Sequence, residues 1–272
     1  MKYKILVIND DGPSSPLIEP FLDALKRQDW VKELRVTLPA DESSWIGHGL
    51  TRFLPLDVIE THIGTHPGYL VTGKPADCAM LGVHHLYPDK PDFVFSGINV
   101  GINSGSAWFL SSGTIGGAQT AALTAMNSAA LSAQVAQEIF KHWKAKDELA
   151  IQAHADDWKR IAENATRICK TLIEAKAWQE ASCYSVNIPW AVTAETDLVV
   201  TQMQQTYLPN LFEKLSKSTY HFKFQPLELE PADHQHLDHS TVLSGKVAVT
   251  PIARTFSKDV SPDLKQKIEV RK

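Results

Sequence analysis

Two adjacent carboxylates stand where an apolar run ends near the start of the chain: Asp10 and Asp11 follow residues 4–8 and precede Gly12. Adjacent aspartates repel one another unless a cation lies beside them, and hard divalent cations prefer carboxylate oxygens as ligands. The pair is therefore a candidate metal site. The alternative is an ordinary Asx turn in which Gly12 supplies a left-handed backbone conformation.

Neutral oxygen donors occur in two later stretches. A polar loop contains Ser43 and Ser44, and a glycine-rich stretch contains Asn99 and Asn103. Asparagine amide oxygens are acceptable ligands for hard cations, and glycines let the backbone approach a ligand closely. Each stretch taken alone is also what a solvated surface loop or a flexible turn looks like.

A third stretch has the residues of an anion site. Ser112-Gly113-Thr114 is followed by small residues and an alanine-rich segment through Met126, which indicates the start of a helix. Free backbone N–H groups and the positive end of the helix dipole face a ligand there. A simple Ser/Thr N-cap explains one hydroxyl but not the whole run. The stretch is not a P-loop, because no lysine follows the glycines.

Alternating strands and helices must position these stretches. The runs at 4–8 and 34–38 flank a segment whose apolar residues share one helical face from Leu17 to Leu25, which predicts a right-handed βαβ unit. Further strands are expected at 70–72, 91–95, 129–132 and 182–189, with helices after Pro75, after Ser112 and between 134 and 176. We therefore expect an α/β fold, a Rossmann-like three-layer sandwich with a mostly parallel central sheet. In such sheets ligands bind outside the carboxyl ends of the strands, where the three stretches would meet.

The last third of the chain is irregular and β-like. A strand pattern at 198–200 and clean alternation at 220–224 predict a C-terminal β-rich extension with an exposed hairpin arm. We expect one domain over residues 1–272, with a core at about 1–200 and an oligomerisation extension at about 201–272.

Two features of that extension invite other interpretations. The cluster from His234 to His239, which includes His236 and Asp238, resembles metal-ligand material, but alternating polar residues in a loop are more often simply solvated. The charged tail after Phe256 is expected to be partly helical and to pack on a partner subunit.

The composition is that of an ordinary globular protein, with 272 residues, 43% hydrophobic and 21% charged. A net charge of −4 argues against a partner such as a nucleic acid duplex, although a small anionic substrate needs only a local site. Cys78, Cys169 and Cys183 form no Cys-x-x-Cys pair, which favours reduced thiols in the cytoplasm. No apolar run approaches the roughly 20 residues of a membrane span, so no membrane partner is expected.

Taken in order, these motifs resemble the SurE survival-protein family of nucleotidases. The resemblance is carried by Asn9-Asp10-Asp11-Gly12, Ser44, Ser96-Gly97-Ile98-Asn99 and Ser112-Gly113-Thr114, with Gly73, Pro75-Ala76-Asp77-Cys78 and Val186-Asn187-Ile188-Pro189 in support. It covers roughly residues 4 to 132 well and thins to scattered strands afterwards. Each motif is modest alone, but the order and spacing of all of them are specific.

The resemblance implies a metal-dependent phosphatase that hydrolyses nucleoside 5′- or 3′-monophosphates to nucleoside and phosphate. One divalent ion, Mg²⁺ or Mn²⁺, would be held by Asp10, Asp11, Ser44 and Asn99. Ser43 is the alternative to Ser44, because an alignment in a loop can slip by one residue. Asp10, Asp11 and Asn99 would also be the catalytic residues, with an aspartate either orienting water as a base or attacking directly.

The same resemblance implies contacts to the substrate phosphate from Asn103, Ser112, Gly113 and Thr114. It also implies a homodimer or homotetramer in which the C-terminal part is exchanged between subunits. The hairpin-like segment at 218–226 suits that exchange.

The chain departs from the family pattern in four places. Lys74 stands where the family often has threonine, and Gly47-His48-Gly49 replaces a stretch rich in serine and asparagine. One extra residue lies between Gly105 and Ser112, and the region at 134–165 is enlarged. These departures affect the expected substrate preference and loop geometry more than the chemistry.

Three other classes of protein carry related patterns. A receiver-like signalling domain also places an acidic pair after its first strand, but it is shorter and needs an aspartate where Ser96 stands. A haloacid-dehalogenase-type phosphatase needs Asp-x-Asp instead of the adjacent pair. A protein that binds metal or nucleotide without catalysis is separated from an enzyme by assaying phosphate released from AMP in the presence of Mn²⁺.

Overall fold

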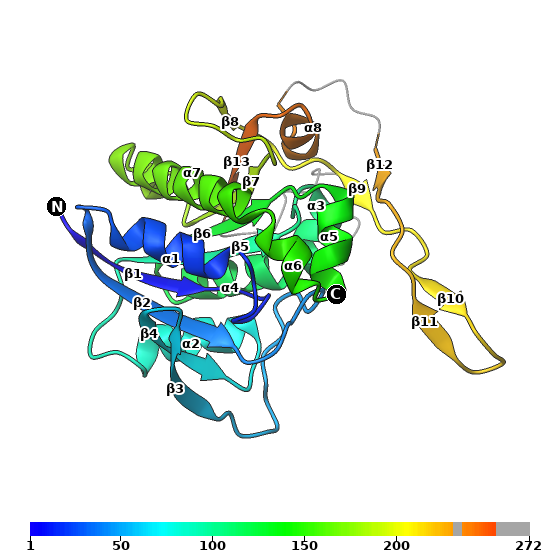
Figure 1. Ribbon diagram of the computed structural model, residues 1–272, viewed down its shortest axis with the longest axis horizontal. Coiled ribbons are helices and arrows are strands. Elements are labelled where there is room, and N and C mark those ends of the chain that lie inside the picture. Colours follow the sequence, from blue (N-terminus) through cyan, green and yellow to red (C-terminus); the bar gives the residue numbers. More distant parts are fainter. Residues whose placement is uncertain (231–235, 254–272) are drawn as a thin grey trace, which may run out of the picture.

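Nine strands form a central sheet in the computed structural model, which describes residues 1–230 and 236–253 (Figure 1). Their order across the sheet is β3-β4-β2-β1-β5-β6-β7-β13-β8. The bounds are β1 Tyr3–Ile8, β2 Val31–Pro39, β3 Val58–Ile63, β4 His66–Val71, β5 Phe93–Val100, β6 Asn127–Ala133, β7 Cys183–Ile188, β8 Leu198–Val200 and β13 Val247–Ile252. The strands from β4 to β7 in this order run parallel, whereas β3 and β13 run antiparallel to β4 and β7.

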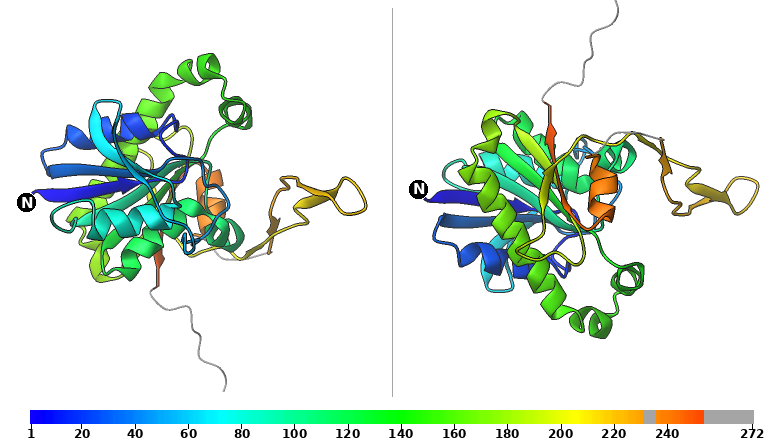
Figure 2. Two further views of the ribbon diagram at one scale, coloured as in Figure 1. Left: turned by 90° about the horizontal axis from the view of Figure 1, so that it is seen from below. Right: turned by 90° about the horizontal axis from the view of Figure 1, so that it is seen from above.

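Helices cover both faces of the sheet (Figure 2). Their bounds are α1 Ile18–Lys26, α2 Pro75–His84, α3 Ser106–Ser111, α4 Gly113–Leu123, α5 Gln137–Lys144, α6 Glu148–Gln152, α7 Ala155–Glu174 and α8 Asp238–Leu243, with a 3-10 turn η1 at Ala177–Gln179. Helices α1 and α7 pack on one face, and α2 and α4 pack on the other. The predicted α/β sandwich with a mostly parallel sheet is confirmed.

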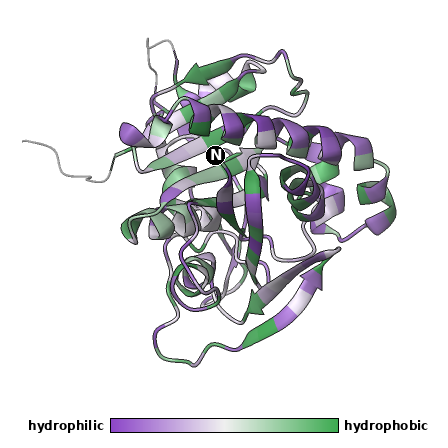
Figure 3. Cartoon of the chain, turned by 90° about the vertical axis from the view of Figure 1, so that its left-hand side faces the viewer, coloured by the Kyte–Doolittle hydropathy of each residue, from purple (hydrophilic) through white to green (hydrophobic). Residues whose placement is uncertain are grey.

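The side chains of β1 explain why this strand lies at the centre. Ile5, Leu6, Val7 and Ile8 are fully buried. Ile5 and Val7 pack in the cluster with α1 and α7, whereas Leu6 and Ile8 face α2 and α4, because successive side chains of a strand point to opposite faces. A parallel strand covered on both faces is an unbroken apolar run, whereas the covering helices carry both hydrophilic and hydrophobic residues (Figure 3).

The strand β5 is longer than the sequence predicts. The apolar run indicates a strand that ends at 95, but pairing with β6 continues to Val100. The register shifts between Ser96 and Asn99, so the chain bulges and then rejoins the ladder. Part of the predicted glycine-rich loop is therefore strand, and Asn99 is held by sheet pairing. The strand β3 and the helix α3 were absent from the sequence prediction, and the strand expected at 70–72 overlaps only the end of β4.

The C-terminal part carries an arm that projects from the sheet (Figures 1 and 2). Strands β10 Phe212–Lys214 and β11 Tyr220–Phe222 form an antiparallel hairpin, which confirms the predicted arm. Nearer the sheet, β9 Thr206–Tyr207 pairs with β12 Glu228–Leu229. The tail after Phe256, for which a helix was predicted, lies outside the described residues.

Candidate metal and phosphate site

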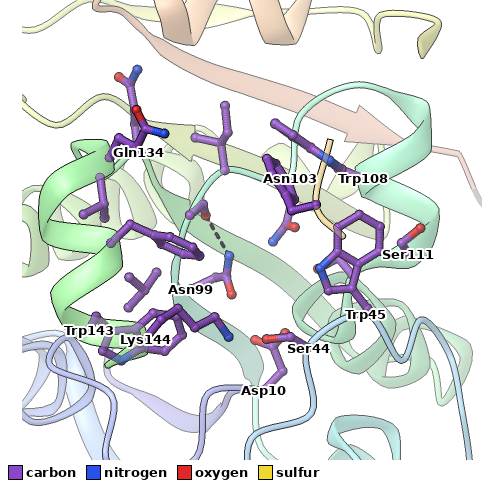
Figure 4. A pocket seen from close by; sticks show the side chains of 18 of the residues that line it. Asp10, Ser44, Trp45, Asn99, Asn103, Trp108, Ser111, Gln134, Trp143 and Lys144 are labelled. Atoms are coloured by element: carbon purple, nitrogen blue, oxygen red, sulfur yellow. Dashed lines mark hydrogen bonds between the residues drawn. The ribbon is translucent and has the colours of Figure 1, made fainter. Parts of the chain in front are cut away.

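The predicted site residues meet at the carboxyl ends of the central strands. Asp10 follows β1, Ser44 follows β2 and Asn99 lies at the end of β5. Together with Asn103 and Ser112, these three line one cavity of about 520 Å³. Figure 4 shows Asp10 and Ser44 side by side at one end of this cavity. The sequence predicted a ligand site at the carboxyl ends of the strands, and these residues do lie together there.

Asp10 is only 2% exposed, and its surroundings hold it in one position. Its Oδ1 atom accepts a hydrogen bond of 2.6 Å from the Thr114 hydroxyl. A Cβ atom placed on Gly113 would lie 2.9 Å from the Asp10 Cβ and 2.8 Å from the Ser43 carbonyl oxygen, so only glycine fits there. Burial raises the pKa of Asp10 to about 6, although the hydrogen bond from Thr114 acts in the opposite direction.

Asp11 is equally buried, but only one of its two carboxylate oxygens has a hydrogen-bond partner among the described residues. Its Oδ2 atom accepts a hydrogen bond of 3.0 Å from the backbone N–H of Val100. Its Oδ1 atom is buried and has no hydrogen-bond partner in the described part of the chain. Burial, followed by the neighbouring charge of Asp10, raises the pKa of this carboxyl well above its usual range. A buried carboxylate oxygen without a donor is costly, and a bound cation would satisfy it.

The structure separates the two serines between which the sequence left a choice. Ser44 lines the cavity, and its hydroxyl donates to Glu42 at 2.7 Å. Ser43 is buried beside the cavity, and its hydroxyl donates to the Asp41 carbonyl at 3.3 Å. The backbone N–H of Ser43 donates to the Asp10 carbonyl at 2.7 Å, which fixes the loop against the end of β1. The side chain of Ser44 is thus the one that faces the cavity.

Asn99 is oriented by its own backbone. Its amide nitrogen donates to the Gly101 carbonyl at 2.7 Å, the contact marked in Figure 4. The other end of the amide group, which is the oxygen, is turned toward the side of the cavity where Asp10 lies (Figure 4). This orientation presents an acceptor, and not a donor, to the carboxylates.

Asn103 connects three elements behind the cavity wall. Its side-chain nitrogen donates to Ser132 on β6 at 2.9 Å and to Thr114 on α4 at 3.4 Å. Its backbone N–H donates to the side-chain oxygen of Asn187 on β7 at 2.8 Å. Asn187 belongs to the supporting motif of the resemblance, and this contact gives that motif a structural role.

The Ser112-Gly113-Thr114 stretch begins α4, as the sequence predicts. Ser112 is the N-cap, and its hydroxyl accepts a hydrogen bond of 3.2 Å from the Ile115 N–H. Ser112 is therefore an ordinary N-cap. Thr114 has a different role, because its hydroxyl donates a hydrogen bond to Asp10. A Cβ on Gly116 would lie 2.1 Å from the Gly47 carbonyl oxygen, so the loop that carries Ser44 rests directly on the first turns of this helix.

Several cavity residues were not predicted from the sequence. They share an aromatic or cationic side chain and line the same cavity: Trp45, Trp108, Phe140, Trp143, Lys144 and Phe224. The ammonium group of Lys144 pairs with Glu42, which links α5 to the loop of Ser44. Trp45 alone had a sequence signal, because it follows the candidate ligand directly. The α5 residues lie within 134–165, the region for which the sequence led us to expect an enlargement relative to the family pattern.

The histidine cluster does not form a second metal site in the described residues. Asp238 accepts backbone hydrogen bonds from Gly105 at 2.9 Å and from Gln204 at 2.8 Å, and His239 bonds to the Ser104 hydroxyl at 2.9 Å. The contacts with Ser104 and Gly105 hold α8 against the loop after β5. Within residues 1–230 and 236–253, no three His, Cys, Asp or Glu side chains are grouped to hold a metal ion. His234 lies outside the described residues.

None of the helices within the described ranges is long and apolar enough to cross a membrane.

Comparisons with known proteins place the chain in a family. A sequence profile described as "Survival protein SurE" matches residues 5–210. A protein of Methanocella arvoryzae named 5'-nucleotidase SurE is 32% identical over 204 residues, covering 75% of this chain and 73% of its own. One of the same name from Methanosarcina acetivorans is 27% identical over 255 residues, covering 93% and 92%.

A solved structure agrees with this relationship. The crystal structure of the SurE protein from Aquifex aeolicus superposes with a TM-score of 0.70 at 28% identity and covers 97% of each chain. The overall fold described above is thus shared with that protein. The chain belongs to the SurE survival-protein family.

Proposed function

We infer that the protein is a phosphatase that hydrolyses nucleoside 5′-monophosphates, and 3′-monophosphates as a second substrate group, to nucleoside and phosphate with the help of one divalent metal ion. Relatives named 5'-nucleotidase support the activity. The observation that carries the proposed site is the buried Asp11 Oδ1 atom, which has no hydrogen-bond donor among the described residues although it adjoins a second buried carboxylate. Such a pair is stable when a cation is bound between or beside the carboxylates.

The donor set fits a hard cation such as Mg²⁺ or Mn²⁺. Asp10 and Asp11 supply carboxylate oxygens, Asn99 an amide oxygen and Ser44 a hydroxyl. Ser44 is preferred to Ser43 because its side chain faces the cavity. A divalent cation held there supplies positive charge to the phosphate and acidifies water. Asp10 and Asp11 would hold it, and either aspartate would orient water as a base or attack the phosphate directly.

The phosphate is proposed to bind between these residues and the N-terminus of α4. The backbone N–H groups that follow Ser112 carry the positive end of the helix dipole, which favours anions. Thr114 anchors Asp10 from the same turn, while Asn103 and Gly113 complete the wall. The ammonium group of Lys144, which pairs with Glu42, adds a cation at the same polar end of the cavity.

The rival classes are less consistent with these residues. A receiver domain requires an aspartate on the strand beside the acidic pair, but β5 carries the fully buried Ser96 opposite Ile8, where β1 ends. A binding protein without catalysis would carry the same buried acidic pair, and it is the relatives named 5'-nucleotidase that favour an enzyme.

The deciding experiment is a phosphate-release assay with AMP, at neutral pH, with Mn²⁺ or Mg²⁺ and with excess EDTA. We expect release that saturates with metal and stops in EDTA. A panel with 3′-AMP and inorganic polyphosphate then defines the range of substrates. If the folded protein binds AMP and metal but releases no phosphate, it is a binding protein and not a phosphatase.

We further propose that residues 1–272 form one domain with an oligomerisation extension at 201–272, that the protein is a homodimer or homotetramer, and that it works in the cytoplasm. The exposed aromatic residues of the arm support self-association, since Phe212 and Tyr220 are each 58% exposed. The three cysteines are free and buried, and burial raises their pKa values, which suits a reducing compartment.

A further inference from the structure

The cavity has an apolar half that metal and phosphate chemistry does not use. Helix α5 lies along one side and contributes Phe140, Trp143 and Lys144, while Trp45 and Trp108 lie on the other side (Figure 4). Its volume of about 520 Å³ is within the usual range for sites that enclose a whole small molecule. A phosphate group with its metal ion would leave most of that space to the rest of the substrate.

The aromatic wall begins beside the polar end of the cavity. The ring centroids of Phe140 and Trp143 are 5.5 Å apart. A Cβ atom built on Gly101 would lie 3.9 Å from the edge of the Phe140 ring and 3.6 Å from the Asn99 side-chain nitrogen. Phe140 is therefore close to the proposed metal ligand, with only the open position at Gly101 between them.

Lys144 joins the two halves. Its ammonium group lies 4.8 Å from the centroid of the Trp143 ring and pairs with Glu42 at the polar end. One helix thus presents a cation where phosphate charge would lie and an aromatic surface directly beyond it. This order, an anion site followed by an aromatic surface, matches the order of phosphate, sugar and base in a nucleotide.

We propose that α5 is the base-recognition element of this enzyme, with the nucleobase stacked on the wall formed by Phe140 and Trp143. This inference rests on the proposed phosphatase function and adds the part of the substrate that determines preference. It gives the region at 134–165 a role, because a helix in that region supplies the wall. Stacking against aromatic rings favours every base, and it favours nucleotides over phosphate esters that lack a base.

The test compares AMP with ribose 5-phosphate, which shares the sugar and the phosphate but has no base. We expect kcat/KM of the wild-type protein to be about 10-fold or more higher for AMP, the size expected for one stacked base. Phe140→Leu keeps an apolar side chain but removes the ring, so kcat/KM should fall for AMP and stay unchanged for ribose 5-phosphate. Phe53→Leu is the matched control, because Phe53 is 85% exposed and lies outside the cavity lining.

A binding measurement without catalysis completes the test. Adenosine, added in EDTA, should quench tryptophan fluorescence in a saturable way, because Trp45, Trp108 and Trp143 line the cavity. The quenching should weaken in Phe140→Leu and persist in Phe53→Leu. Equal kcat/KM for AMP and ribose 5-phosphate in the wild-type protein, or no adenosine binding, overturns the inference while leaving the phosphatase intact. If the protein hydrolyses neither AMP nor ribose 5-phosphate, the proposed phosphatase function is refuted. Adenosine binding alone then decides whether the aromatic wall binds bases.

Discussion

At the scale of single residues, the acidic pair carries the account. Two carboxyls that are each 2% exposed and adjacent in sequence would normally be avoided, because burial and mutual repulsion both oppose their ionisation. Asp10 is stabilised by Thr114, but Asp11 retains a buried oxygen with no donor in the described part of the chain. Groups with strongly perturbed pKa values in a cavity mark functional sites more often than structural ones. The pair is best understood as a site built for a cation.

Thr114 offers a substitution that tests how Asp10 is positioned. Thr114→Val removes the hydroxyl that donates to Asp10 and keeps the shape of the side chain. A hydrogen bond to a charged group contributes about 1.5–3 kcal/mol, so kcat/KM for AMP should fall by at least about 10-fold. The matched control is Thr120→Val on the same helix, since its hydroxyl donates to the Gly116 carbonyl at 2.7 Å, away from the acidic pair. Equal effects of the two substitutions would show that the hydroxyl of Thr114 has no special role.

At the scale of elements, the sequence predicted what local patterns determine. The apolar run of β1, the turn after it and the cap of α4 are encoded within a few residues, and each is found in the structure. The extension of β5 to Val100 depends on pairing with β6, which no local pattern shows. The placement of α5 over the cavity depends likewise on distant contacts, such as that of Lys144 with Glu42. The sequence therefore did not predict the aromatic half of the cavity, because contacts between distant parts of the chain place α5 there.

An ion-pair cluster at the other end of β2 predicts how stability depends on acid. The guanidinium of Arg35, buried with only 1% exposure, binds both Glu33 and Asp89. Its hydrogen bonds lower the pKa of Glu33 and lower that of Asp89 to about 2. The unfolded chain therefore takes up protons near pH 4 before the folded protein does, so this contribution to stability is present above that pH and is lost as the pH falls toward about 2.

Urea unfolding at about pH 5 and about pH 3 measures this contribution. Burial raises the pKa values of Asp10 and Asp11, and these two carboxyls change the stability of the whole protein in the opposite direction as the pH falls, so each variant is compared with the wild-type protein at both pH values. Glu33→Gln and Asp89→Asn should each destabilise the protein more at about pH 5 than at about pH 3, because the substituted side chain no longer titrates. Equal destabilisation at the two pH values in both variants would show that this cluster does not contribute to the pH dependence of stability.

At the scale of the whole molecule, the arm is the feature that a single chain does not explain. Its hairpin projects from the sheet (Figure 1) and exposes aromatic side chains to solvent. Phe224, at the base of the arm, nevertheless lines the cavity, and Phe222 contacts Trp45 with ring centroids 5.4 Å apart. The arm therefore connects the surface proposed for self-association with the wall of the site.

Removing the hairpin tests its part in assembly. The N–H of Lys223 donates to the Leu211 carbonyl at 2.8 Å, so these two residues are close enough to be joined by Asn-Gly in place of 212–222. Light scattering should give a dimer or tetramer for the intact protein and a smaller species for the shortened one. A monomer for the intact protein at micromolar concentration would contradict the proposed oligomer.

The central claim, that Asp10 and Asp11 bind the catalytic metal, is tested most directly by Asp10→Asn. Bound Mn²⁺ and phosphate released from AMP should be measured on the same samples, with thermal unfolding in EDTA as a check of folding. We predict one Mn²⁺ per wild-type chain, and for the variant a folded protein whose metal affinity is reduced and whose hydrolysis falls by at least about 100-fold. Hydrolysis near the wild-type rate in Asp10→Asn would contradict the account.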